Sequence, residues 1–149
     1  MARRLNSEEV RKVLAAELAA GAARIRDNYG PQIGWEALQR LLADRTCVPY
    51  PCEVQFEAGP LLPGEFAHAL PKGQTPAEGY TIYVHPLYLS QLSRVPFLVL
   101  PQLVMVHHGQ RVTAEDAELF GATALGMSKE DYFQALCELS DQIGGDELM

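Results

Sequence analysis

The segment Tyr80-Thr81-Ile82-Tyr83-Val84, with the mostly apolar residues 87–109 behind it, decides the fold class of this chain. Every residue of the first segment is β-branched or aromatic, which gives it the strongest strand propensity in the sequence. The apolar stretch predicts one or two buried helical segments, and we expect Pro101 either to kink a single helix or to separate two. A strand beside buried helices indicates a mixed α+β domain.

The region before that strand predicts a small sheet. Residues 46–86 contain seven prolines and four glycines and show no helical period. Residues 52–57 alternate between polar and apolar side chains, which predicts a half-buried strand with Val54 and Phe56 facing the core. With a further short strand over residues 66–70, we expect a mixed or antiparallel sheet packed against helices.

Two helices are predicted on the N-terminal side. Asn6-Ser7-Glu8-Glu9 matches a capping box and opens a helix over residues 7–26, which ends before Gly30-Pro31. A second helix covers about residues 34–44. The side chains expected on the buried faces of these two helices are Val10, Val13, Leu14, Leu18 and Ile25, and Trp35, Leu38, Leu41 and Leu42.

Two more helices are predicted near the C-terminus. Thr113 is placed to cap the first, which Gly126 ends, and Ser128 is placed to cap the second. Gly144-Gly145 is expected to stop the last helix and to leave an acidic tail over residues 144–149. The side chains expected to face inward from the last helix are Tyr132, Phe133, Leu136, Leu139 and Ile143.

Length and composition predict one domain over residues 1–149, divided into 1–45, 46–86, 87–143 and 144–149. The chain is 48% apolar and 21% charged, which suits a folded core. Its net charge of −7 disfavours a nucleic-acid binder, because phosphate binding needs a basic surface.

The charge is uneven along the chain. Residues 1–26 carry six basic and three acidic groups, whereas residues 113–149 carry nine acidic groups and Lys129. We favour two solvated helix faces of opposite sign. The alternative is that the two ends approach each other, within a chain or between the chains of a homo-oligomer.

A cytoplasmic location is expected, without a membrane span. No apolar region follows the basic start of the chain, and prolines interrupt the longest apolar run, residues 95–106. The three cysteines, Cys47, Cys52 and Cys137, suggest reduced thiols rather than disulfides.

A resemblance to a known family is carried by the strand and the apolar stretch together. Ile82-Tyr83-Val84-His85-Pro86, followed by Phe97-Leu98-Val99-Leu100-Pro101-Gln102-Leu103-Val104-Met105-Val106-His107-His108-Gly109, resembles the core of minimal bacterial zincin-like metallopeptidases of the ImmA/IrrE type. The next helix, Asp116-Ala117-Glu118-Leu119-Phe120-Gly121-Ala122, and Leu125-Gly126-Met127 look like the stretch that follows in that family. The resemblance covers residues 53–127 and implies a zincin-like domain with extra N- and C-terminal helices.

The catalytic motif of that family is missing. Where its members carry His-Glu-x-x-His, this chain has Pro101, Gln102 and Met105 at the three functional positions. Proline has no ligand atom, an amide is no general base near neutral pH, and a thioether is a poor zinc ligand. Only Asp116 and Glu118, near the family's third-ligand region, keep carboxylates. The resemblance therefore implies a degenerate metallopeptidase, or pseudoenzyme, without catalytic residues or a cofactor, that binds a protein or peptide partner.

The alternative is a metal-binding protein or metal-dependent hydrolase with a non-standard site. His85 with His107 or His108 and a carboxylate such as Asp116 or Glu118 would supply the ligands for a divalent metal. The simpler interpretation, which we favour, is that histidines at the end of a helix interact with its dipole and cap its carbonyls.

Overall fold

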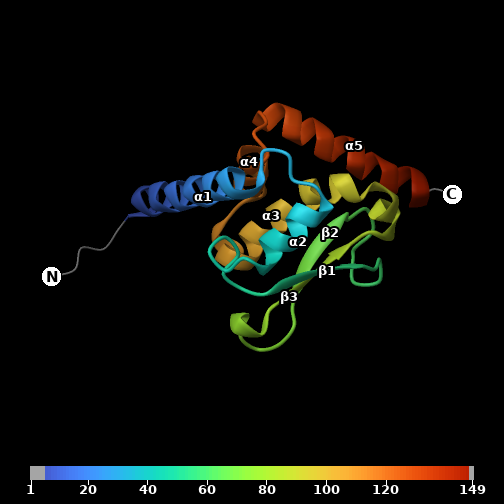
Figure 1. Ribbon diagram of the computed structural model, residues 1–149, viewed down its shortest axis with the longest axis horizontal. Coiled ribbons are helices and arrows are strands. Elements are labelled where there is room, and N and C mark those ends of the chain that lie inside the picture. The colour runs from blue at the N-terminus through green and yellow to red at the C-terminus, as the bar shows by residue number, and fades with distance from the viewer. Residues whose placement is uncertain (1–5, 148–149) are drawn as a thin grey trace.

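The computed structural model describes residues 6–147, in which helices pack on a small sheet and further helices pack on these (Figure 1). Its fold class is α+β, as predicted from the sequence. In chain order the elements are α1 (Ser7–Tyr29), α2 (Trp35–Ala43), β1 (Cys52–Phe56), β2 (Ala67–Pro71), η1 (Pro76–Glu78), β3 (Tyr80–Val84), η2 (Pro86–Arg94), α3 (Val95–His108), η3 (Gly109–Arg111), α4 (Ala114–Ala124) and α5 (Lys129–Glu147).

The sheet is mixed and has β3 at its centre. The strand order is β1-β3-β2, with β1 parallel and β2 antiparallel to β3, so that Ile82 lies between Val54 and Ala69. Ile82 and Val84 are fully buried, while Val54 and Phe56 are half-buried against the core, as their alternation predicts. The segment with the strongest strand propensity is therefore the central strand, to which both β1 and β2 are hydrogen-bonded.

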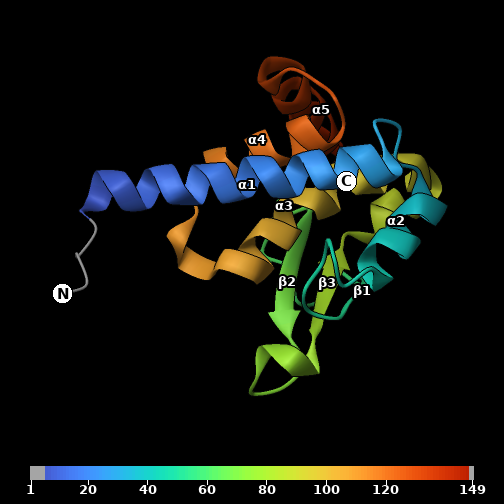
Figure 2. The same ribbon diagram turned by 60° about the vertical axis from the view of Figure 1, so that its left-hand side comes forward.

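The helix α3 connects the sheet to the other helices. It packs on β2 and β3 on one side and on α4 and α5 on the other, and α1 lies along α4 (Figures 1 and 2). Ten of its fourteen residues are buried, because neighbours cover most of its surface. This explains why residues 95–108 are apolar almost all round rather than on one stripe.

The segment 86–108 does not break where the sequence predicts. Pro101 does not separate two segments, because α3 runs from Val95 through Pro101 to His108. The break lies earlier, at Gln91, whose backbone is not helical. By length and composition this is the one segment of residues 6–147 that could cross a membrane, but half of it is buried inside the fold. Such burial is also typical of a core helix.

The helix α1 begins as predicted and then extends past its neighbours. Asn6 Oδ1 accepts a hydrogen bond from the Glu9 N–H, which makes Asn6 the N-cap, and the Asn6 side-chain amide donates to the Glu9 carboxylate. The prediction that Val10 and Val13 are buried is wrong, since they are 44% and 49% exposed. Figure 2 shows that the first turns of α1 project beyond the elements on which the rest of the helix packs.

Two expectations for the last helix are also wrong. Phe133 is 52% exposed, because the buried stripe of α5 follows Tyr132, Leu136, Leu139 and Ile143, and residue 133 lies about 100° away from residue 132. The glycines at 144 and 145 do not end α5, which continues to Glu147, so residues 144–147 are helix rather than tail. Residues 148–149 lie outside the described part of the chain.

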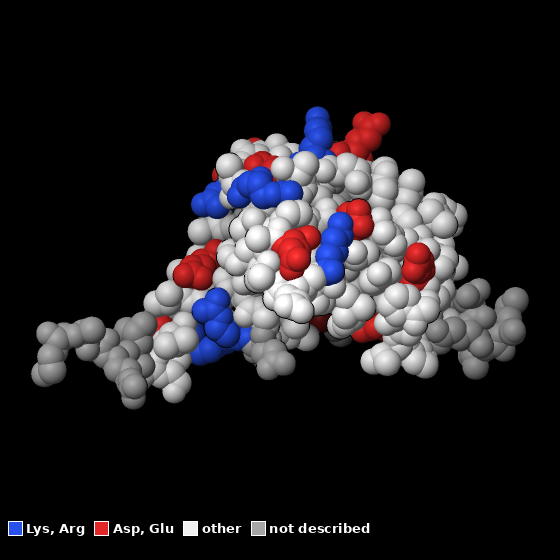
Figure 3. All heavy atoms as spheres, turned by 90° about the horizontal axis from the view of Figure 1, so that it is seen from below, with Lys and Arg blue, Asp and Glu red and all other residues white. Residues whose placement is uncertain are grey.

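The oppositely charged ends of the chain meet at an ion pair. Arg11 of α1 binds Asp116 of α4, which shows the two ends approaching within one chain rather than as two fully solvated faces. Lys129 at the start of α5 pairs with Glu115 at 2.8 Å. On the face drawn in Figure 3, acidic and basic side chains are interspersed, without an extended patch of either sign.

Candidate functional site

The three positions that correspond to the zinc motif lie where α3 meets the sheet, and two of them take part in packing or hydrogen bonding. Pro101 is buried, and the half-buried Gln102 donates from Nε2 to the Ala67 carbonyl of the edge strand β2, at 3.4 Å. Met105, one turn beyond Pro101, is 40% exposed. This face of α3 therefore presents a pyrrolidine ring, an amide bonded to backbone, and a thioether.

His85 is held by the turn that links β3 to η2. Its Nδ1 accepts a hydrogen bond from the Leu87 N–H at 3.1 Å, and its ring meets the ring of Tyr88 edge-on. The first bond makes His85 a cap of the helical segment that follows. Its position is thus explained by local structure.

His107 and His108 lie side by side at the end of α3, with ring centroids 4.2 Å apart. His107 is exposed and faces Tyr50 edge-on, whereas His108 is buried and its Nδ1 lies 3.3 Å from Nη2 of Arg111. Burial, together with the charges of His107 and Arg111, lowers the pKa of His108 below its ordinary value. His108 is therefore a neutral imidazole near pH 7.

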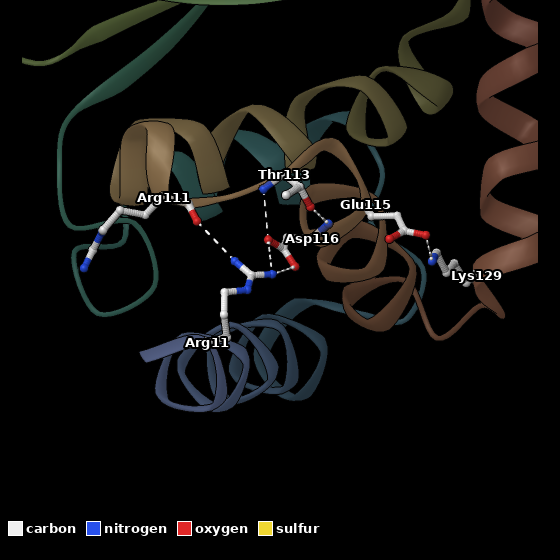
Figure 4. A network of polar contacts seen from close by, with 6 residues as sticks. All are labelled: Arg11, Arg111, Thr113, Glu115, Asp116 and Lys129. Atoms are coloured by element: carbon white, nitrogen blue, oxygen red, sulfur yellow. Dashed lines mark hydrogen bonds and ion pairs between the residues drawn. The ribbon is translucent and has the colours of Figure 1, made fainter. Parts of the chain in front are cut away.

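Asp116 belongs to a network at the start of α4 (Figure 4). Its Oδ2 accepts from the Thr113 N–H, its own N–H donates to Thr113 Oγ1, and Nη2 of Arg11 donates to both of its carboxylate oxygens. Burial alone would raise the pKa of Asp116, but the hydrogen bonds from Thr113 and Arg11 outweigh it and lower the pKa. The carboxylate is thus committed to capping α4 and binding α1.

The predicted metal ligands stay apart. In the part of the chain whose side chains are described, no three His, Cys, Asp or Glu residues gather closely enough to hold a metal ion. His85 bonds the turn after β3, the two adjacent histidines end α3, and Asp116 binds Arg11. The charge of Glu118 instead helps to raise the pKa of Tyr132 and the pKa of Lys129. The alternative of a non-standard metal site therefore has no assembled ligand set in this part of the chain.

A hollow lies beside the C-terminal half of α3. It is a cleft of about 410 Å³ between α1, the segment 45–49 and the C-terminal half of α3, with Phe120 of α4 at its base. Because successive helix residues are about 100° apart, Met105 and His107 point roughly 160° away from each other. The cleft contains His107 and His108 but neither Pro101, Gln102 nor Met105.

Two arginines stand at the edge of this cleft, and both are held by backbone carbonyls. Nη1 of Arg24 donates to the Thr46 carbonyl at 3.0 Å, and Nη1 of Arg45 donates to the Leu42 carbonyl at 3.0 Å. The sequence analysis did not single out either residue. No local pattern marks them, because the cleft is assembled from four segments that are distant in the sequence.

A second, smaller cleft of about 110 Å³ lies between α1 and α4. Alanines of α1 form one side of it, and Leu119, Phe120 and Thr123 of α4 form the other, with Asp116 at the edge. Its small volume results from incomplete filling between two packed helices.

Comparisons with models of protein families, with curated proteins and with solved structures found no match for this chain.

Proposed function

We propose that this chain is a non-catalytic binding domain of zincin-like architecture, which holds a protein or peptide partner in the cleft between α1, the segment 45–49 and α3. The resemblance of residues 53–127 to minimal metallopeptidases supports the architecture, since a strand leads into the buried helix that would carry the zinc motif. The geometry of α3 supports the change from catalysis to binding.

The single observation that carries the proposal is the difference in surroundings between two sides of α3. On the side of the lost motif, Pro101 is packed in the core and Gln102 bonds β2, so the residues that would do chemistry stabilise the fold. On the other side, Leu103, Val104 and His107 line an open cleft. A hollow of this size with an apolar base and a few polar groups is typical of a binding site.

The exposed part of α1 extends this surface. Val10 and Val13 precede Glu17 of the cleft by seven and four residues, so they lie on the same face of the helix. Both are apolar and nearly half exposed on the projecting half of α1. A partner that fills the cleft can therefore continue along this helix, and exposed apolar side chains of this kind mark interaction surfaces.

A first experiment tests the absence of catalysis. Protein purified without an affinity tag is analysed for zinc, iron and nickel and assayed with a pool of fluorogenic peptides. We expect substoichiometric metal and no hydrolysis above a buffer control. Metal-dependent turnover that disappears in Gln102→Ala or Met105→Ala would overturn the proposal.

A second experiment tests the binding face. Peptides are selected on the immobilised protein from a random displayed library and measured against Val13→Asp, which changes the α1 side, and Met105→Asp, which changes the opposite side of α3. Both positions are exposed, which makes the variants a matched pair. We expect about tenfold weaker binding for Val13→Asp alone. Selection of no peptide, or loss only in Met105→Asp, would contradict the proposed site.

A further inference from the structure

We propose that the cleft recognises a carboxylate next to an apolar group, and that its occupant is the free C-terminus of a peptide that ends in an apolar residue. This inference rests on the proposed function, because it names the chemical class of the partner at the same cleft. It is carried by an apolar base, two arginines with free donors, and one acidic group that limits the charge of the ligand.

The base of the cleft is apolar and rigid. It is formed by buried side chains from α1, α3, α4 and the segment before β1, namely Leu18, Val48, Leu103, Val104 and Phe120. All of them belong to the main core, so their positions are fixed by packing before a ligand arrives. Such a base favours an apolar side chain over water.

The edge next to this base is cationic. Arg24 and Arg45 each use Nη1 to bond backbone carbonyls, which orients both guanidinium groups and leaves Nη2 and Nε as further donors. Among the residues whose side chains the structure describes, no carboxylate lies within salt-bridge distance of either arginine. A guanidinium with free N–H groups is well matched to a carboxylate, which it binds through charge-assisted hydrogen bonds.

His108 adds a neutral donor to the wall of the cleft. An arginine side chain can only donate, so the contact from Arg111 makes Nδ1 of His108 the acceptor and places the ring proton on Nε2. Among the described residues no buried side-chain nitrogen lacks a partner, so Nε2 is accessible rather than sealed in the core. It can donate to a backbone carbonyl of a bound peptide.

Glu17 restricts the charge that the cleft accepts. It lies on α1 two turns before Arg24, about 10 Å along the helix axis. Its negative charge opposes the lowering of the His108 pKa. The cleft is thus cationic at the Arg24 end and acidic at the Glu17 end. One carboxylate fits this arrangement, whereas a polyanion such as a nucleic acid would meet the Glu17 carboxylate.

The C-terminal residue of a peptide can contact both the apolar base and the cationic edge of the cleft. An acidic side chain brings a carboxylate on a short stem, without an apolar group beside it. A terminal Leu or Phe carries its carboxylate on the same Cα as its apolar side chain. A free small carboxylic acid has the same chemistry, and the experiment separates the two sources.

The test uses fluorescence polarisation with the full chain. Labelled hexapeptides with random sequence and a terminal Leu or Phe are prepared as free acids and as C-terminal amides, and N-acetyl-leucine serves as competitor. We expect the acids to bind at least about tenfold more tightly than the amides. Weak competition by N-acetyl-leucine is expected, while competition as strong as that of a peptide would overturn the peptide assignment.

Variants test the residues. Arg24→Gln with Arg45→Gln should reduce acid binding to the amide level, Arg40→Gln should change it less than twofold, and Glu17→Gln should tighten it. Thermal unfolding of each variant shows that it folds. Acids and amides that bind equally, but lose binding in Val13→Asp, would overturn this inference and leave the proposed function intact. Failure of both forms to bind would overturn both.

Discussion

The hydroxyl of Tyr132 in α5 donates a hydrogen bond to the backbone carbonyl of Phe97 in α3. That carbonyl is the one which a regular helix would pair with the N–H of residue 101, and residue 101 is a proline without an N–H. The rings of Phe97 and Tyr132 also stack, with centroids 5.7 Å apart. A side chain from another helix thus replaces the backbone bond that Pro101 removes, which is why α3 continues through it.

This relationship predicts a coupled pair of substitutions. Tyr132→Phe leaves the Phe97 carbonyl buried without a donor, so we expect it to lower the free energy of unfolding by about 1–3 kcal/mol. In a Pro101→Ala background the alanine N–H can satisfy the same carbonyl. The cost of Tyr132→Phe should therefore fall by about 1 kcal/mol there, as measured by urea unfolding of all four proteins in a double-mutant cycle. Tyr88→Phe, which removes the bond to the Leu139 carbonyl, is the control and should cost the same in both backgrounds.

Two helix glycines are predicted to respond in opposite directions. A Cβ at Gly121 in α4 would come within 2.6 Å of Cζ of Tyr132, while a Cβ at Gly21 in α1 would lie 3.5 Å from Phe120, an ordinary contact. We expect Gly121→Ala to destabilise by about 1–3 kcal/mol through overpacking. Gly21→Ala should stabilise by about 0.5–1 kcal/mol through helix propensity. Thermal melts of both variants check the pair, and a stabilised Gly121→Ala would refute the packing argument.

The sequence predicts this fold where the signal is local. Caps at Asn6 and Thr113 and the strand at residues 80–84 depend on neighbouring residues, and each is found where it was expected. Periodicity indicates a face of a helix but not the length over which another helix covers it. For this reason it places Val10 in the core, although no other element covers the Val10 side chain, which is 44% exposed.

Long-range contacts limit what the sequence can predict about Pro101 and about the candidate cleft. The local rule for proline is correct about the lost hydrogen bond, but its replacement comes from a residue 35 positions away from Phe97. The cleft could not be predicted, because Arg24, Arg45 and His108 come from three segments with no common pattern. The sequence therefore predicts the helix α3, but it does not predict which side of α3 lines the cleft.

The contact between α1 and α4 is predicted to depend on pH. Since Thr113 and Arg11 hold the pKa of Asp116 below its ordinary value, Asp116 stabilises the fold above the unfolded-state pKa of about 4, and this contribution is lost as the pH falls through the folded value. We expect Asp116→Asn to cost about 1–2 kcal/mol at pH 7 and progressively less in acid. Urea unfolding between pH 7 and pH 2.5 measures it. Lys12→Gln, on an exposed pair of α1, is the control and should change stability by under about 0.5 kcal/mol at every pH.

A second carboxylate, Asp44, is predicted to titrate unusually low. Hydrogen bonds from the hydroxyl groups of Thr46 and Tyr29 and from the Thr46 N–H lower the pKa of Asp44 to about 2. Its stabilising effect is therefore complete above about pH 4 and disappears as the pH falls toward 2. An NMR titration of the side-chain carboxyl carbons should show a midpoint near 2, which rises in Tyr29→Phe. A midpoint at the ordinary value in the unmodified protein would contradict these bonds.

Introducing a zinc motif on α3 should not create a metallopeptidase. Pro101→His with Gln102→Glu and Met105→His supplies two imidazoles one turn apart on α3 and a carboxylate beside the first. A catalytic zinc site needs a third protein ligand, and Asp116, the carboxylate expected from the sequence as a metal ligand, is already bound by Arg11 and Thr113. The carboxylate introduced by Gln102→Glu would also place an acceptor against the Ala67 carbonyl, where Gln102 donates, so we expect a loss of about 1–3 kcal/mol.

The measurements are zinc affinity by competition with a chromophoric chelator and hydrolysis of the fluorogenic peptide pool, after circular dichroism has shown that the variant is folded. The matched control keeps Gln102 and changes only Pro101→His and Met105→His, which isolates the cost of the carboxylate. We expect weak zinc binding in both variants and no hydrolysis, because two ligands leave the metal without the third that fixes a catalytic site. Tight zinc binding with peptide hydrolysis by the triple variant would show instead that a third ligand is within reach of α3.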